Sequence, residues 1–187
     1  MVNMSADRLR RPLAFALSRT VKLLVIATTG ILLAAAACAA GRAAAVTSRG
    51  LGPVLYGMTV AQFSHSVREA MSEPQNPEDR GCFYLESKRF KGVSFMFEDG
   101  KIRRIDVRTD KISTQDGIRI GTTVAAVKRR YGARLSDEPH HYSGPEDRYL
   151  TLSLEGDIAV RFEASDAKVE NFYVGKKAQV QYVEGCL

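Results

Sequence analysis

The stretch Val93–Val107, VSFMFEDGKIRRIDV, predicts two antiparallel strands joined by a tight turn. The first half, 93–98, is mostly apolar, and the second half, 102–107, mixes apolar and polar residues. The Asp-Gly pair at 99–100 between them is a strong signal for a short hairpin. A related pair of segments follows later in the chain, with IAVRFE at 158–163 and VENFYV at 169–174. We therefore expect two hairpins of related sequence.

Each predicted hairpin follows a segment with helical periodicity. Residues 57–67 begin Gly-Met-Thr, and their apolar residues then recur at the spacing of one face of an amphipathic helix. Residues 121–131 begin Gly-Thr-Thr and repeat that spacing. Thr59 and Gln62 fit a capping box at the start of the first helix, and Gly132 supplies a stop for the second. The recurrence predicts an internal duplication.

The duplication predicts an α+β fold, a tandem repeat of a helix plus antiparallel hairpin strands, with the sheet covered on one face by the helices. The expected boundaries are 1–45 for an export signal, 50–112 for the first module and 113–187 for the second. Residues 179–183, QVQYV, predict one more strand, and 136–147 predict a polar loop that contains prolines.

Three sequence motifs carry a resemblance to known proteins. GVSFMFEDGKIRRIDV, GIRIGTTVAAVKRRYG and QYVEGC together resemble a family of uncharacterised proteobacterial exported proteins and lipoproteins. The helix start and hairpin sheet are similar to the small module of the outer-membrane assembly lipoproteins and, in tandem, to the beta-lactamase inhibitory proteins. The resemblance covers residues 50–187 and implies a non-catalytic, protein-binding role at the cell envelope. It transfers no inhibitory or assembly residue.

The N-terminal residues have the features of an export signal. A basic segment precedes Leu23–Gly41, which carries no charge and ends in small residues. Ala35–Cys38 resembles a lipobox, in which Cys38 would be acylated, whereas cleavage after Ala43–Ala45 would release a soluble protein. An uncleaved helix would instead anchor the chain in a membrane. Each alternative predicts an exported protein, either periplasmic or a membrane-anchored lipoprotein.

The cysteine count agrees with export. Cys82 and Cys186 remain once Cys38 is acylated or removed, and two cysteines in an oxidising compartment predict a disulfide. A zinc site is the alternative, but neither cysteine has a C-x-x-C partner or a nearby histidine. We expect no metal and no cofactor.

The formal net charge of +6 is concentrated at the N-terminus. Residues 1–37 hold five basic side chains against one acidic one, which leaves +2 for the remainder. Basic clusters at 88–91, 103–104 and 128–130 are typical of surfaces that face solvent. The alternative is that these clusters bind anionic lipid headgroups. We expect no nucleic-acid partner, because an exported protein does not meet the chromosome.

The sequence lacks the motifs of known catalytic sites, such as G-x-S-x-G, H-E-x-x-H, a P-loop or a dinucleotide fingerprint. We expect no enzyme and no catalytic residue. The most distinctive loop is 139–145, PHHYSGP. Tyrosine, histidine and arginine anchor interfaces well, so this loop and its counterpart near Tyr84 form the candidate binding site. The candidate residues are His140, His141, Tyr142, Arg148, Tyr149 and Tyr84. The alternative is that the tyrosines merely pack under the loop.

The expected function is that of an exported, non-catalytic binding module of the envelope, a scaffold or an inhibitor with an envelope protein as partner. Cys38 or the N-terminal helix would provide membrane anchorage. The alternative is a small periplasmic enzyme, or a ligand- or glycan-binding protein, that uses the 139–149 loop. An enzyme built on that loop would lose turnover in His140→Ala, whereas a binding module would lose only some affinity.

Overall fold

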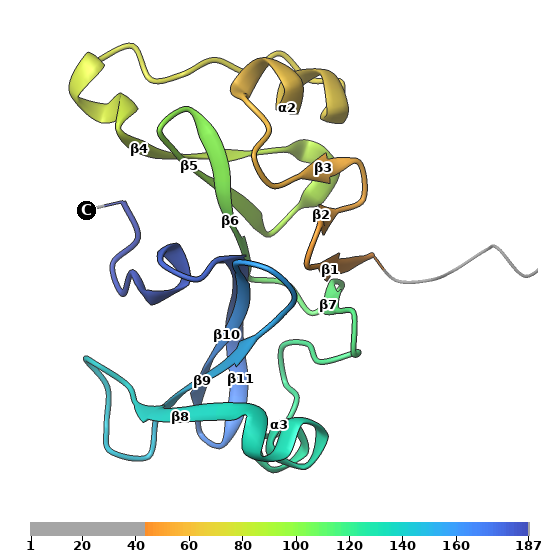
Figure 1. Ribbon diagram of the computed structural model, residues 1–187, viewed down its shortest axis with the longest axis vertical. Coiled ribbons are helices and arrows are strands. Elements are labelled where there is room, and N and C mark those ends of the chain that lie inside the picture. Colours follow the sequence, from red (N-terminus) through yellow and green to blue (C-terminus); the bar gives the residue numbers. More distant parts are fainter. Residues whose placement is uncertain (1–43, 187) are drawn as a thin grey trace, which may run out of the picture. The chain divides into compact units, whose positions relative to one another are not determined.

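The computed structural model describes residues 44–186, which form two sheets and two α-helices (Figure 1). The smaller sheet has the strand order β3-β2-β1-β7, and the larger has the order β4-β5-β6-β11-β10-β9-β8. The strands are β1 (Ala45–Thr47), β2 (Gly50–Leu51), β3 (Val54–Leu55), β4 (Cys82–Glu86), β5 (Val93–Glu98), β6 (Lys101–Val107), β7 (Ser113–Thr114), β8 (Leu135–Pro139), β9 (Arg148–Ser153), β10 (Ile158–Ser165) and β11 (Lys168–Lys176). The helices are α2 (Val60–Val67) and α3 (Val124–Tyr131), with 3-10 helices η2 (Pro77–Arg80), η3 (Lys88–Phe90), η4 (Gly132–Arg134) and η5 (Gln179–Gln181).

The two expected hairpins are present as β5–β6 and β10–β11. Asp99 and Gly100 both adopt positive φ, 51° and 67°, which is the backbone conformation that a two-residue hairpin turn requires. The second hairpin turns at Asp166 and Ala167, also with positive φ. β6 pairs with β11 antiparallel, and this pairing joins the two hairpins in one sheet.

Backbone hydrogen bonds fix the start of each helix to the second strand of a hairpin. Before α2, the Gly57 amide donates to the Ile102 carbonyl at 2.8 Å. Before α3, the Gly121 amide donates to the Val169 carbonyl at 2.8 Å. Thr59 forms the predicted capping box with Gln62, and Gly132 ends α3 with a φ of 56°. The local signals for both helices are therefore confirmed.

One face of the seven-stranded sheet is apolar and carries the core. Phe63 of α2 packs on Phe95 with ring centroids 4.7 Å apart, and Tyr131 of α3 stacks on Phe162 at 6.3 Å. The small sheet contributes to the same core cluster with Val46, Leu51 and Val54. Burial of these side chains is the main favourable term in the stability of the fold.

The expected α+β fold, with a tandem of helix plus hairpin and a sheet covered by helices, is wrong. Residues 44–186 are mostly β, with eleven strands and two helices of eight residues each. A helix of that length spans only about 12 Å, so the two helices cannot cover seven strands spaced about 4.8 Å apart. The small sheet covers part of the apolar face. Its two-residue strands β2 and β3 are too short for a period-two pattern to reveal them.

Two further expectations are corrected. Residues 179–181 form the 3-10 helix η5 where a strand was expected, because the chain turns at Ala178 and the Gln181 amide donates back to the Ala178 carbonyl at 3.0 Å. Residues 136–139, the first part of the expected loop at 136–147, belong to the strand β8 (Leu135–Pro139). β8 is an edge strand, and an edge tolerates both charged side chains and Pro139.

The expected export signal, including Cys38, lies outside the described residues. Within residues 44–186, no helix is long and apolar enough to cross a membrane.

Candidate binding surface

The second face of the seven-stranded sheet is polar. Side chains alternate along a strand, so the neighbours of the core residues point away from the core. The Arg104 guanidinium lies 4.3 Å from the ring centroid of Tyr173, and that of Arg161 lies 4.6 Å from Tyr149. The His140 ring stacks on Tyr149 at 4.3 Å. Cations and rings thus alternate across several strands, which holds long side chains in fixed positions.

Arg104 is buried on this face and all five of its N–H donors are used. Its Nε and Nη2 donate to the two carboxylate oxygens of Asp106 at 2.7 and 2.9 Å, and Nη2 also donates to the Tyr84 hydroxyl at 2.7 Å. Its Nη1 donates to the carbonyls of Gln179 and Tyr182 at 2.8 and 3.0 Å. A guanidinium has no further donor to offer a ligand. Arg104 therefore positions the C-terminal residues.

The tyrosines of the polar face are held in their protonated form. Burial, followed by the charge of Asp106, raises the pKa of Tyr84 to about 12. Burial, followed by the charge of Glu163, raises the pKa of Tyr173 well above its usual value. The Tyr173 hydroxyl donates to Glu163 at 3.0 Å. At neutral pH both hydroxyls therefore keep their protons and donate to carboxylates, Tyr84 to Asp106 and Tyr173 to Glu163.

Residues 179–186, the C-terminal segment, lie against the polar face on the side of the sheet opposite α2 and α3 (Figure 1). Val180 is fully buried and packs with Ala159 and Tyr173. The Gln179 amide and the Tyr182 hydroxyl both donate to the Glu98 carboxylate, at 2.5 and 3.0 Å. The segment is thus seated on the sheet by one apolar side chain and several hydrogen bonds.

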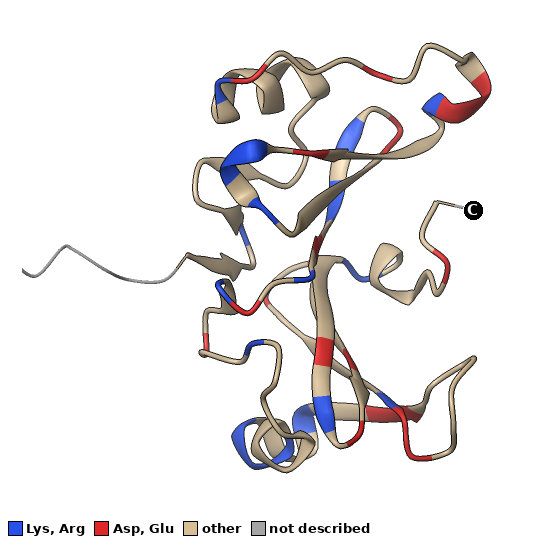
Figure 2. Ribbon diagram, turned by 180° about the vertical axis from the view of Figure 1, so that it is seen from behind, with Lys and Arg blue, Asp and Glu red and all other residues tan. Residues whose placement is uncertain are grey.

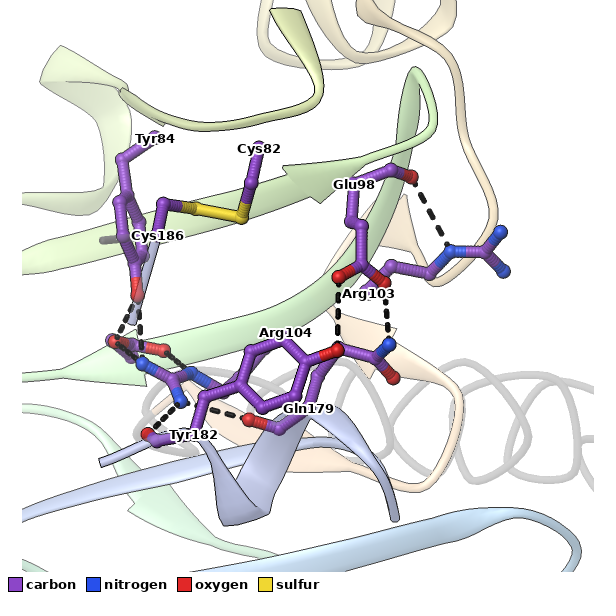
Figure 3. Close-up of a disulfide and its surroundings, with 9 residues drawn as sticks. Cys82, Tyr84, Glu98, Arg103, Arg104, Gln179, Tyr182 and Cys186 are labelled. Carbon is purple, nitrogen blue, oxygen red and sulfur yellow. Dashed lines mark hydrogen bonds and ion pairs between the residues drawn. A yellow bond between two sulfur atoms is a disulfide. The ribbon is translucent and has the colours of Figure 1, made fainter. Parts of the chain in front are cut away.

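The predicted disulfide between Cys82 and Cys186 is present (Figure 3). It joins the first residue of β4 to the end of the C-terminal segment, with a sequence separation of 104 residues. Cys82 is paired in register with Glu98 of β5, so the disulfide and the Glu98 hydrogen bonds hold neighbouring parts of the segment.

The predicted binding loop is organised by His140. Its Nδ1 accepts hydrogen bonds from the backbone amides of Tyr142 and Ser143, at 3.3 and 3.2 Å. Tyr142 is 64% exposed, and its hydroxyl donates to Glu184 of the C-terminal segment. That hydrogen bond raises the pKa of Tyr142. His141 is exposed and its ring meets Tyr142 edge-on at 4.6 Å.

The other candidate residues lie beside or behind this loop. Tyr149 is buried beneath His140. Tyr84 lies on β4, where it is half-buried and accepts a hydrogen bond from Arg104 of β6. Arg148 is the strand neighbour of Tyr149 and therefore points to the α3 side, where its Nε contacts Asp137 at 2.7 Å. The structure brings His140, His141, Tyr142 and Tyr149 together, whereas Tyr84 and Arg148 lie apart from them.

Tyr142 and the C-terminal segment line an open cavity of about 520 Å³. We call the side chains around it the tyrosine surface, which consists of Tyr142, Tyr182, Glu98 and Glu184. The disulfide cysteines Cys82 and Cys186 also line this cavity. Sequence reasoning missed Tyr182 and Glu98. The signal for them was available, because a Cys82–Cys186 disulfide places residues 182–184 beside the end of the first hairpin.

Basic side chains gather elsewhere in the molecule. Figure 2 shows lysine and arginine on α3, away from the C-terminal segment. Lys128 is paired with Asp137 at 2.5 Å and Arg130 with Asp116 at 2.6 Å. The cluster at 128–130 is therefore partly neutralised by the protein itself. Cations in the last turn also interact favourably with the helix dipole.

The sequence matches no protein-family model and no curated protein. Among solved structures, the chain is similar to the uncharacterized protein yfeY from Escherichia coli, with 16% sequence identity and a TM-score of 0.45. The similarity covers 71% of this chain and 99% of that one.

Proposed function

We propose that this protein is an exported, non-catalytic binding module of the cell envelope that holds a protein partner at the tyrosine surface. The observation that carries the proposal is the exposure of Tyr142 and Tyr182, 64% and 37%, around one cavity. In residues 44–186, Leu55 is the one other large hydrophobic side chain with comparable exposure. Tyrosines of this kind dominate the energetics of protein interfaces.

The tyrosine surface is organised before a partner arrives. The Tyr142 hydroxyl donates to Glu184 and the Tyr182 hydroxyl donates to Glu98 at 3.0 Å, so both rings are oriented. A side chain that is already ordered loses less conformational entropy on binding, which favours affinity.

Binding is favoured over catalysis because the polar groups of this region are engaged with one another. Arg104 has no free donor, and Nδ1 of His140 already accepts two backbone hydrogen bonds. Within the described part of the chain, no buried side-chain nitrogen or oxygen lacks a partner. A general acid or base needs a group that is free to exchange a proton with substrate.

The placement in the envelope rests on the sequence. The basic and apolar segments before residue 45 support export, and a disulfide is compatible with an oxidising compartment. Cys38 or the N-terminal helix would supply membrane anchorage.

The test is site-specific photo-crosslinking in cells. A photoreactive amino acid replaces Tyr142, Tyr182 or, as a control on α3, Arg129. We expect one discrete protein adduct from positions 142 and 182 and none from 129. With that partner purified, Tyr142→Ala should weaken binding about 30-fold, as expected of an interface hot spot of about 2 kcal/mol. Equal adducts from all three positions, or an unchanged affinity, would contradict the proposal.

A further inference from the structure

We propose that the Cys82–Cys186 disulfide is a thiol-exchange site that controls the tyrosine surface. Its reduction by a dithiol would free residues 183–186 and remove Glu184 from the tyrosine surface, while the seven-stranded sheet stays folded. This inference rests on the proposed function, because it names the regulation of the same surface.

The disulfide can be reached from solvent. Cys82 and Cys186 are both only half-buried, and both line the open cavity of about 520 Å³ beside Tyr142 and Tyr182. A thiolate that enters this cavity meets the disulfide without crossing the hydrophobic core, which packs against the other face of the sheet. Accessible disulfides are the ones that exchange with thiols.

The first half of the C-terminal segment has anchors that do not depend on the disulfide. Val180 is fully buried, and the Gln179 carbonyl accepts from Arg104 at 2.8 Å. Gln181 accepts a hydrogen bond from Arg161, and the Tyr182 carbonyl accepts from Arg104 at 3.0 Å. Residues 179–182 therefore stay seated when the disulfide opens.

The second half depends on the disulfide. Within the described part of the chain, residues 183–186 take part in one hydrogen bond, which the Tyr142 hydroxyl donates to the Glu184 carboxylate. It joins two exposed side chains, and such contacts contribute little to stability. Gly185 also lies close against the Tyr84 ring, since a Cβ there would come within 2.6 Å of the Tyr84 hydroxyl oxygen. Without the covalent link, little else holds this turn in place.

The chemistry balances with a dithiol as the reductant. One of its thiolates attacks a disulfide sulfur, the Cys82–Cys186 bond breaks, and the other cysteine leaves as a thiolate. The second thiol of the reductant then attacks the mixed disulfide. The protein gains two electrons and two protons and ends with two thiols, while the reductant becomes a disulfide. Glu184 then separates from Tyr142, and the tyrosine surface loses one of its carboxylates.

The experiment measures backbone order in the exported protein by ¹⁵N NMR relaxation, before and after treatment with dithiothreitol. In the oxidised protein we expect order parameters of about 0.85 both for residues 183–186 and for β5. After reduction, those of residues 183–186 should fall below about 0.6 while β5 is unchanged. The double variant Cys82→Ser/Cys186→Ser should behave like the reduced protein without treatment. Glu184→Gln, which keeps the disulfide, should behave like the oxidised one.

Three results would overturn the inference. Residues 183–186 could stay ordered after reduction, β5 could lose order together with them, or dithiothreitol could fail to reduce the folded protein. None of these results depends on a partner, so they are distinguishable from a failure of the proposed function. If the inference holds and the proposed function fails, the segment becomes mobile while positions 142 and 182 give no adduct.

Discussion

At the scale of single residues, Arg104 decides how the C-terminal segment meets the sheet. Burial lowers the pKa of its guanidinium, but the charge and hydrogen bonds of Asp106 outweigh that effect and keep the pKa above its usual value. The residue therefore remains a cation even though it is 3% exposed. A buried charge is tolerated only where its partner and its hydrogen bonds are complete.

Arg104→Ala should destabilise the protein by about 3–5 kcal/mol, because Asp106 would be left buried without its cation. Urea denaturation followed by circular dichroism measures this change. The double variant Arg104→Met/Asp106→Asn is the control, since it removes both charges and keeps similar volume. It should recover the part of the lost stability that is due to the unpaired charge of Asp106, while the hydrogen bonds of Arg104 to Gln179 and Tyr182 stay lost. An Arg104→Ala variant as stable as the parent would show that the pair contributes nothing.

At the scale of elements, the sheet depends on a close contact between β6 and β11. Gly175 pairs with Arg104, and a Cβ on Gly175 would lie 2.4 Å from the Arg103 carbonyl oxygen and 2.7 Å from the Arg104 Cα. The residue is glycine because the neighbouring backbone occupies the space of a side chain. This contact joins the first hairpin to the second.

Gly175→Ala should therefore push β11 away from β6 and destabilise the protein by about 1–3 kcal/mol, the usual cost of overpacking. The matched control is Gly144→Ala in the exposed loop, where an added Cβ meets nothing within 4 Å. Urea midpoints of the two variants provide the comparison. Similar midpoints for both would mean that the β6–β11 contact is looser than the structure has it.

The elements that sequence predicted correctly are those specified by neighbouring residues. Asp99 and Gly100 define a hairpin turn, and Thr59 with Gln62 caps a helix, because the groups involved lie within a few positions of each other. The small sheet was missed because strands of two residues carry no pattern. With that sheet unseen, the two helices were expected to cover the core by themselves.

In the candidate site, too, local sequence identified some residues and missed those that distant parts of the chain bring together. The loop at 139–145 is distinctive by composition, and Tyr142 is the most exposed of the large hydrophobic side chains described. Glu98 and Tyr182 lie 84 residues apart, and the Cys82–Cys186 pairing is the one sequence feature that indicates their proximity. η5 likewise depends on a distant residue, since its Gln179 carbonyl accepts a hydrogen bond from Arg104 of β6.

At the scale of the whole molecule, the disulfide is the covalent tie between the first hairpin and the end of the chain. Closing a loop of about 100 residues stabilises a protein by roughly 4–5 kcal/mol in the chain-entropy model. Domains of this size have stabilities of about 5–15 kcal/mol. The reduced protein is therefore expected to stay folded, with a smaller free energy of unfolding than the oxidised protein. The proposed thiol exchange requires this.

The intact mass of the protein from fractionated cells, with and without reductant, tests most directly that it is an exported, disulfide-closed module. We predict a chain that is recovered outside the cytoplasm and gains the mass of two hydrogens on reduction. A start at Cys38 with added acyl mass would indicate a lipoprotein, and a start near Val46 a soluble periplasmic protein. A full-length chain in the cytosolic fraction, with no mass change on reduction, would contradict the account.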